Sequence, residues 1–174
     1  MIGYIVEDNA QEKAIIEITR KLGIQTVKRF IRFMDGNRLK KASKYVRDLV
    51  LTGCQKVIVL KDLEGAPPKV EERFKRLKFL PQARLFIIVR EIETWFLADE
   101  EALEDYLKVR IKPIPEPERV LNPKGFLSRL FEEARGEGYH EEGIDPAEIA
   151  RRLRLEVVEK KCPSFKKFRE LVGR

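Results

Sequence analysis

The chain has few of the side chains that build most metal centres and nucleophilic sites: two cysteines, Cys54 and Cys162, and a single histidine, His140. These numbers exclude a cysteine-rich zinc site and a disulfide-stapled fold. His140 lies in the sequence GYHE, with no G-x-S-x-G motif and no nearby cysteine, so no nucleophilic triad is recognisable. A metal ion in this protein would therefore be bound by oxygen ligands.

Other familiar signals are also missing. The sequence contains neither a P-loop nor a G-x-G-x-x-G fingerprint, which excludes the common nucleotide-binding motifs. No apolar run reaches the roughly 18 residues that a membrane-spanning helix needs. The first residues, MIGYIVE, lack the basic start and cleavage site of a signal peptide. We therefore expect a cytoplasmic protein with no membrane partner.

Apolar and charged residues are abundant. Hydrophobic types supply 43% and charged types 37% of the 174 residues. A chain of this length buries roughly 70% of its unfolded surface, so we expect one compact domain. Lys, Arg and Glu greatly outnumber Asn and Gln, a usage that resembles that of thermophilic proteins.

Positive charge is concentrated in two stretches. Residues 151–174 carry nine Lys or Arg residues against three Glu residues, a net charge of +6, so the rest of the chain carries only +1 of the total +7. Residues 28–47 contain a single acid, Asp35. Such stretches favour a nucleic-acid partner, although a solvated basic face without a partner is an equally open interpretation. The candidate nucleic-acid-binding residues are Arg151, Arg152, Lys160, Lys161, Lys166 and Lys167, together with Lys61.

Apolar runs alternate with helical periodicity through the first 99 residues. Strands are predicted over residues 2–6, 24–33, 57–60 and 85–89, with helices between them. Continuous apolar runs indicate strands covered on both faces, hence a mainly parallel four-stranded sheet in a three-layer α/β architecture. Asn9 is the predicted N-cap of the first helix, and Asp99 that of a helix over residues 100–107. We expect an α/β core over residues 1–99 and, packed on it, a helical appendage over residues 100–174.

Acidic residues follow three of these strands. Glu7 and Asp8 follow the first, Asp62 and Glu64 the third, and Glu91 and Glu93 the fourth. Ligands of open α/β sheets bind beyond the carboxyl ends of the strands, so these acids converge if the three strands are neighbours. Converging carboxylates repel one another unless a cation lies between them. Magnesium takes such oxygen ligands, and the sequence therefore predicts a Mg²⁺ (or Mn²⁺) site.

Two groups of residues carry a family resemblance. A glutamate after the first strand, with the run VIVLKDLE (residues 57–64), resembles the Toprim pattern, in which an acidic pair ends the third strand. The segment EIETWFLAD (residues 91–99) and the later SFKKF (residues 164–168) look like an uncharacterised Toprim-like family, domain of unknown function 4276. The resemblance implies that Glu7 is a general acid/base or metal ligand. It also implies that Asp62 and Glu64 bind the metal, supported by Glu93, and that the protein processes nucleic-acid phosphodiesters, as a nuclease would.

Competing interpretations remain open. A non-catalytic module could use the same acids and the basic tail to bind nucleic acid or a partner protein, including a second copy of the chain. The order Glu7-Asp8 and then Asp62 also resembles a response-regulator receiver, whose fourth strand should end in a hydroxyl residue; here it ends in Arg90-Glu91. Within the family motif, Trp95 is expected to anchor the appendage to the sheet. Ser164 either caps the last helix or donates to a phosphate or the acids.

Overall fold

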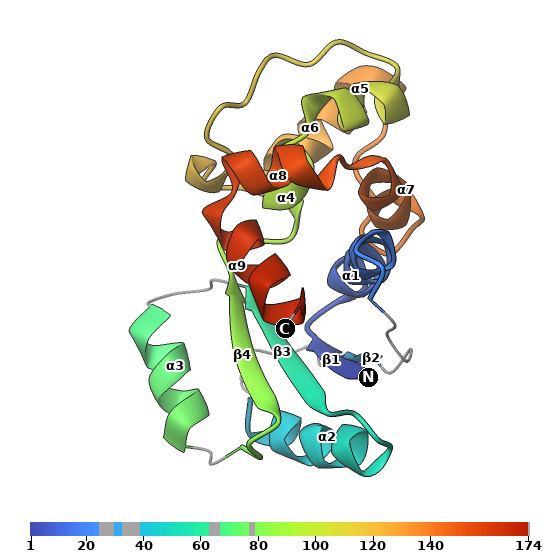
Figure 1. Cartoon of the computed structure of the whole chain (residues 1–174). Coiled ribbons are helices and arrows are strands. Elements are labelled where there is room, and N and C mark those ends of the chain that lie inside the picture. The colour runs from blue at the N-terminus through green and yellow to red at the C-terminus, as the bar shows by residue number, and fades with distance from the viewer. Residues whose placement is uncertain (25–29, 33–38, 63–66, 77–78, 174) are drawn as a thin grey trace.

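The computed structural model describes residues 1–24, 30–32, 39–62, 67–76 and 79–173 (Figure 1). Strands alternate with helices as far as β4, and helices follow from there to the C-terminus. The elements in chain order are β1 (Ile2–Val6), α1 (Asn9–Lys21), β2 (Phe30–Arg32), α2 (Leu39–Leu51), β3 (Lys56–Asp62), α3 (Pro67–Arg76), β4 (Ala83–Ile88), α4 (Glu93–Leu97), α5 (Glu100–Leu107), the short 3₁₀ helix η1 (Pro117–Arg119), α6 (Pro123–Arg135), α7 (Asp145–Arg152), α8 (Leu155–Lys161) and α9 (Pro163–Gly173).

The sheet is open and parallel, with the strand order β2-β1-β3-β4. Tyr4 of β1 pairs with Ile58 of β3, and Val59 of β3 pairs with Leu85 of β4. The predicted mixed α/β class with a parallel sheet is therefore confirmed. The first, third and fourth strands are neighbours, so their carboxyl ends lie at one edge.

The predicted four-stranded sheet is confirmed only in part, because just three of its strands are well formed. Three strands have five to seven residues, whereas β2 has only three, at the edge of the sheet beside β1. The expected span over residues 24–33 lies partly outside the described residues. Short, charged strands are typical of sheet edges, because they limit pairing with other chains. The basic sequence KRFIR (residues 28–32) fits that position better than a central one.

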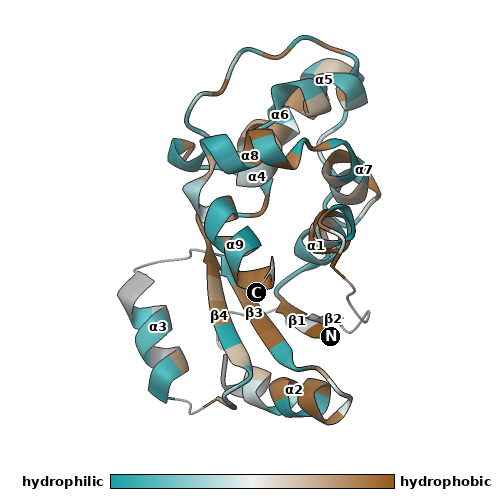
Figure 2. Cartoon of the chain, in the orientation of Figure 1, coloured by the Kyte–Doolittle hydropathy of each residue, from teal (hydrophilic) through white to brown (hydrophobic). Residues whose placement is uncertain are grey.

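Helices cover both faces of the sheet, as the alternation of side chains requires. On one face Tyr4, Val6 and Ile58 pack with α1 and with Phe165 and Phe168 of α9. On the other face a second cluster joins Ile5, Val57 and Val59 to α2. Hydrophobic residues accordingly run along β1 and β3, while the helices are mixed in colour (Figure 2). Continuous apolar strands thus predicted the two covered faces correctly.

The start of α1 is capped by Asp8 rather than by the predicted Asn9. The Asp8 side chain accepts a hydrogen bond of 2.8 Å from the backbone N–H of Gln11. The helix therefore begins at Asn9, one residue earlier than predicted. Asp99 caps α5 as expected, with its side chain accepting from the N–H of Ala102.

The family motif joins the sheet to the C-terminal helices. Trp95 is fully buried, packs edge-on against Phe165 at 5.0 Å between ring centroids, and donates from Nε1 to Ser164 Oγ at 3.1 Å. The prediction that Trp95 is an anchor is confirmed. Asp99, also fully buried, accepts hydrogen bonds from the backbone and the guanidinium of Arg154. One apolar cluster therefore extends across residue 99, where we expected the appendage to begin.

In the part of the chain that the structure describes, every helix is too short or too polar to span a bilayer.

Candidate functional site

A carboxylate-lined cavity of about 220 Å³ lies at the carboxyl edge of the sheet. The chain continues from this end of β4 into the C-terminal helices (Figure 1). The strand order reverses between β1 and β3, and ligands of doubly wound folds bind at such switch points. The cavity is lined by residues after β1, at the end of β3, after β4, and in and around α6: Asp8, Asp62, Arg90, Glu91, Glu93, Leu121, Lys124 and Glu141. We call it the carboxylate cavity.

Glu7 holds the end of β3 in place. Its Oε1 accepts from Lys61 Nζ at 2.5 Å, and its Oε2 accepts from the backbone N–H of Asp62 at 2.7 Å. The ion pair is largely buried, with 8% of the Lys61 and 15% of the Glu7 side chain exposed. The structure therefore brings Glu7 and Asp62 together, but it points the Glu7 carboxylate at Lys61 and the β3 backbone.

Gln11 links β1 to the Asp62 carboxyl. Its Nε2 donates to Asp62 Oδ1 at 2.8 Å, and its Oε1 accepts from the backbone N–H of Glu7 at 3.0 Å. Gln11 itself is fully buried. The Asp62 carboxyl is thus fixed by a neutral amide, and this contact brings it no positive charge.

The environment of Asp62 and Glu93 favours their neutral forms. Burial raises the pKa of Asp62 to about 9, and the negative charges of Glu7, Asp8 and Glu93 add to the rise. Burial likewise raises the pKa of Glu93 to about 7, with further contributions from Asp8 and Glu91. The pKa of Asp8 is also raised, chiefly by burial. These carboxyls converge as the strand ends predicted, and they are electrostatically unsatisfied.

Lys124 lines the cavity and Tyr139 lies beside Glu93, and no local sequence pattern pointed to either residue. Tyr139 is 9% exposed, and burial together with the negative charge of the nearby Glu93 raises the pKa of its hydroxyl. Lys124, near the start of α6, forms an ion pair with Glu141, and its backbone N–H donates to Glu91. Both come from the appendage, far from the strands in sequence.

Arg90 is the other cation of the cavity. It follows β4 directly, and its backbone has a φ of 65°, in the left-handed region that disfavours side chains. In the sequence, Arg90 was informative only as a departure from the receiver pattern. Its position at a strand end beside two glutamates was a usable signal for a site residue.

The predicted metal ligands are only partly described. Asp62 and Glu93 both line the cavity, whereas Glu64 lies outside the described residues. Within the described ranges, no three His, Cys, Asp or Glu side chains are grouped so as to hold one metal ion. The donors nevertheless suit a hard cation, since all are oxygens and several of the carboxyls repel one another.

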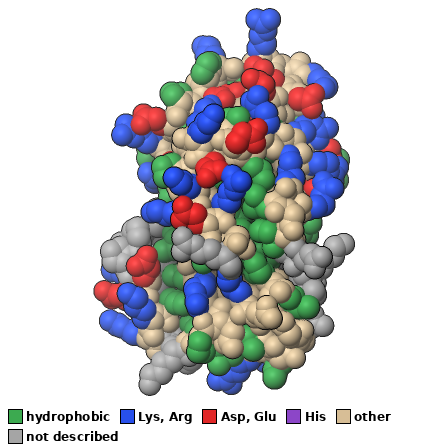
Figure 3. Space-filling view, in the orientation of Figure 1, with side chains coloured by type: hydrophobic (Ala, Val, Ile, Leu, Met, Phe, Trp, Pro, Cys, Tyr) green, Lys and Arg blue, Asp and Glu red, His purple; other side chains and the backbone are tan. Residues whose placement is uncertain are grey.

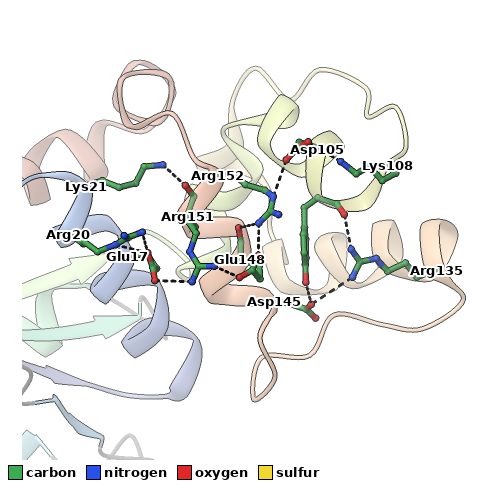
Figure 4. Close-up of polar contacts among 11 residues, drawn as sticks. Glu17, Arg20, Lys21, Asp105, Lys108, Arg135, Asp145, Glu148, Arg151 and Arg152 are labelled. Carbon is green, nitrogen blue, oxygen red and sulfur yellow. Dashed lines mark hydrogen bonds and ion pairs between the residues drawn. The ribbon is translucent and has the colours of Figure 1, made fainter.

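Several of the predicted nucleic-acid-binding residues are used in ion pairs. Arg151 pairs with Glu17 and Glu148, and Arg152 pairs with Glu148 and Asp105, as Figure 4 shows. These contacts join α1, α5 and α7. In the same way Lys161 pairs with Glu100, and Lys61 is buried against Glu7. The high positive charge of the tail therefore largely neutralises acids of this same chain.

The other predicted basic residues are exposed. Lys160, Lys166 and Lys167 lie on α8 and α9, and none forms an ion pair with another described residue. Blue and red side chains are intermingled over the helical half in the space-filling view, without a continuous basic face (Figure 3). The other basic stretch, residues 28–47, lies partly outside the described residues.

Comparison with known proteins gives one match. A family model described as "Domain of unknown function (DUF4276)" matches residues 6–172. The match extends from the end of β1 into α9 and includes every residue of the carboxylate cavity. The expected resemblance to that family is confirmed, and the comparisons do not extend it to Toprim domains. No curated protein and no solved structure matches the chain.

Proposed function

We propose that this chain, which belongs to the DUF4276 family because that family's model matches residues 6–172, binds a divalent cation in the carboxylate cavity and uses it to process nucleic-acid phosphodiesters. One observation carries the proposal: Asp8, Asp62 and Glu93 converge at the switch point of the sheet with raised pKa values. A divalent cation would relieve their repulsion, which is otherwise relieved only by protonation.

The residues present fit magnesium or manganese. Mg²⁺ is commonly held by one or two carboxylates, with water and phosphate oxygens completing its shell, so three convergent protein ligands are not required. Asp62 and Glu93 are the proposed ligands, with Asp8 beside them. Glu64, which the Toprim resemblance implies as the partner of Asp62, remains a proposed ligand.

Each side chain has a distinct part in this proposal. When bound, the cation would orient a phosphate and stabilise the charge that develops on its oxygens. Glu7 is a positioning residue in this arrangement, because its carboxylate fixes the backbone of Asp62 and neutralises Lys61. The general acid/base role implied for Glu7 would require its contact with Lys61 to open.

The Toprim-like fold and the nucleic-acid substrate belong to the same proposal. Strand order and the position of the acids are compatible with a Toprim-like sheet, in which β2 would be the short fourth strand. Exposed Lys160, Lys166 and Lys167 would contact the sugar-phosphate backbone without reading bases. Binding should therefore weaken steeply with salt.

A non-catalytic module is the second candidate, because no three described ligand side chains surround one point. The test compares wild type, Asp62→Asn and the control Asp48→Asn, whose side chain is exposed on α2. Each is incubated with single- and double-stranded DNA and RNA in Mg²⁺, in Mn²⁺ and in EDTA.

We expect metal-dependent cleavage that Asp48→Asn retains and Asp62→Asn loses by at least 100-fold. Binding without cleavage would support the module instead. Absence of both would refute the nucleic-acid assignment, and labelling of Asp62 by acetyl phosphate would point to a receiver.

A further inference from the structure

Arg90 adopts a backbone conformation that its own side chain disfavours. Of the described residues other than glycine, only Arg90 and Lys108 have positive φ values, 65° and 60°. Lys108 is the C-cap of α5, where the left-handed conformation commonly ends a helix. Arg90 has no such role, because it follows β4 and precedes α4, which begins at Glu93. Strained residues of this kind are found preferentially at functional sites.

Arg90 also lines the carboxylate cavity without an acidic partner in the part of the chain that the structure describes. Among the described residues, the Arg90 guanidinium forms no hydrogen bond or ion pair, although five carboxylates line the same cavity: Asp8, Asp62, Glu91, Glu93 and Glu141. The second cation of the cavity, Lys124, is already paired with Glu141. In the tail, by contrast, the arginines Arg151, Arg152 and Arg154 all have acidic partners. Of the described cations that line the cavity, Arg90 is thus the one available to a ligand.

A guanidinium recognises a particular ligand chemistry. Its planar fork of N–H donors matches two oxygens of a phosphate, and Arg is favoured where such planar, two-point recognition is needed. A phosphate bound only to the carboxylates would be repelled, whereas one placed between a cation on Asp62 and the Arg90 guanidinium meets positive charge on both sides.

We propose that Arg90 binds the non-bridging oxygens of the substrate phosphate, on the side opposite the cation. This inference rests on the proposed function, because it assumes a cation at Asp62 and Glu93. It assigns the cavity a phosphate-binding subsite, with Arg90 as a residue that touches substrate and with a phosphoryl group as the ligand class.

The test separates cation binding from phosphate binding. Mn²⁺ affinity is measured from the electron paramagnetic resonance signal of the free ion. Inorganic phosphate affinity is then measured on the Mn²⁺-loaded protein, from the relaxation of the ³¹P nucleus near the bound ion. The variants are Arg90→Gly and Arg90→Lys, with Lys108→Gly as the matched control, since it also removes a cation at a positive φ.

We expect Arg90→Gly to lower phosphate affinity at least tenfold while Mn²⁺ binds equally well or more tightly, because a positive charge has been removed from the cavity. Arg90→Lys should retain only part of the affinity, and Lys108→Gly should change neither measurement. Glycine accepts this φ, so Arg90→Gly should fold. If Mn²⁺ binds and Arg90→Gly keeps wild-type phosphate affinity, the phosphate subsite is refuted but the proposed function is not. If wild type binds no Mn²⁺, both the proposed function and the phosphate subsite are refuted.

Discussion

Replacing Asp62 by Asn should stabilise the protein in the absence of metal. The Asp62 carboxyl is partly buried, surrounded by acidic residues and held by the neutral amide of Gln11. An asparagine has nearly the same shape, keeps the oxygen that accepts from Gln11, and leaves the backbone N–H bonded to Glu7. The substitution therefore removes mainly the cost of placing an acidic group in this cavity.

The size of the effect follows from the pKa of Asp62. Burial raises this pKa from 3.8 to about 9 in the folded state, so between these values the folded protein holds a proton that the unfolded chain has released. Stability therefore falls as pH rises through this window, by about 1.4 kcal/mol per pH unit. At pH 7 the accumulated cost is about 4 kcal/mol, and below pH 4 it is close to zero.

Urea unfolding in EDTA at pH 4, 5.5, 7 and 8.5 measures this difference directly. The free energy of unfolding of Asp62→Asn should equal that of wild type at pH 4 and exceed it by about 4 kcal/mol at pH 7. The control Asp48→Asn changes an exposed carboxylate and should differ from wild type by less than about 0.5 kcal/mol at every pH. Parallel stability curves for wild type and Asp62→Asn would refute this electrostatic reasoning. Added Mg²⁺ should stabilise wild type at pH 7 and have little effect on Asp62→Asn.

Two further substitutions test the packing around the site. Lys61→Met leaves the Glu7 carboxylate unpaired and should cost about 3–5 kcal/mol in urea unfolding. Adding Glu7→Gln should recover part of that loss, and an equal loss in the double variant would contradict the ion-pair explanation. Ser164→Ala removes the acceptor of the Trp95 N–H and should cost about 1 kcal/mol. Because Trp95 is the only tryptophan, its fluorescence emission should shift at the same time; an unchanged spectrum would argue against this hydrogen bond.

The carboxyls of the carboxylate cavity destabilise the fold, but they also provide oxygen ligands for a cation. Asp62 and Glu93 would be less costly as amides, yet both line a small cavity beside a strained arginine. Arrangements that break several rules of stable packing at one place are typical of sites that bind something. Cation binding would offset the repulsion and link the stability of the fold to occupancy of the site.

Local sequence determined much of the architecture by itself. Apolar runs such as VIVL (residues 57–60) predict buried parallel strands, because only strands covered on both faces need hydrophobic residues at successive positions. The acids after β1, β3 and β4 predict a common edge, because parallel strands end on the same side. The burial of Trp95 followed from its size and from its place between the sheet and the later helices.

Tertiary structure alone decided which charges remain available. No local pattern indicates that Lys61 lies against Glu7, or that Arg151 and Arg152 pair with acids of α1 and α5, since these partners are 47 to 134 residues apart. It was likewise only the folded chain that brought Tyr139 and Lys124 to the strand ends. Charge interactions act through space rather than along the chain, so the sequence could identify the acids of the site but not the partners of its cations.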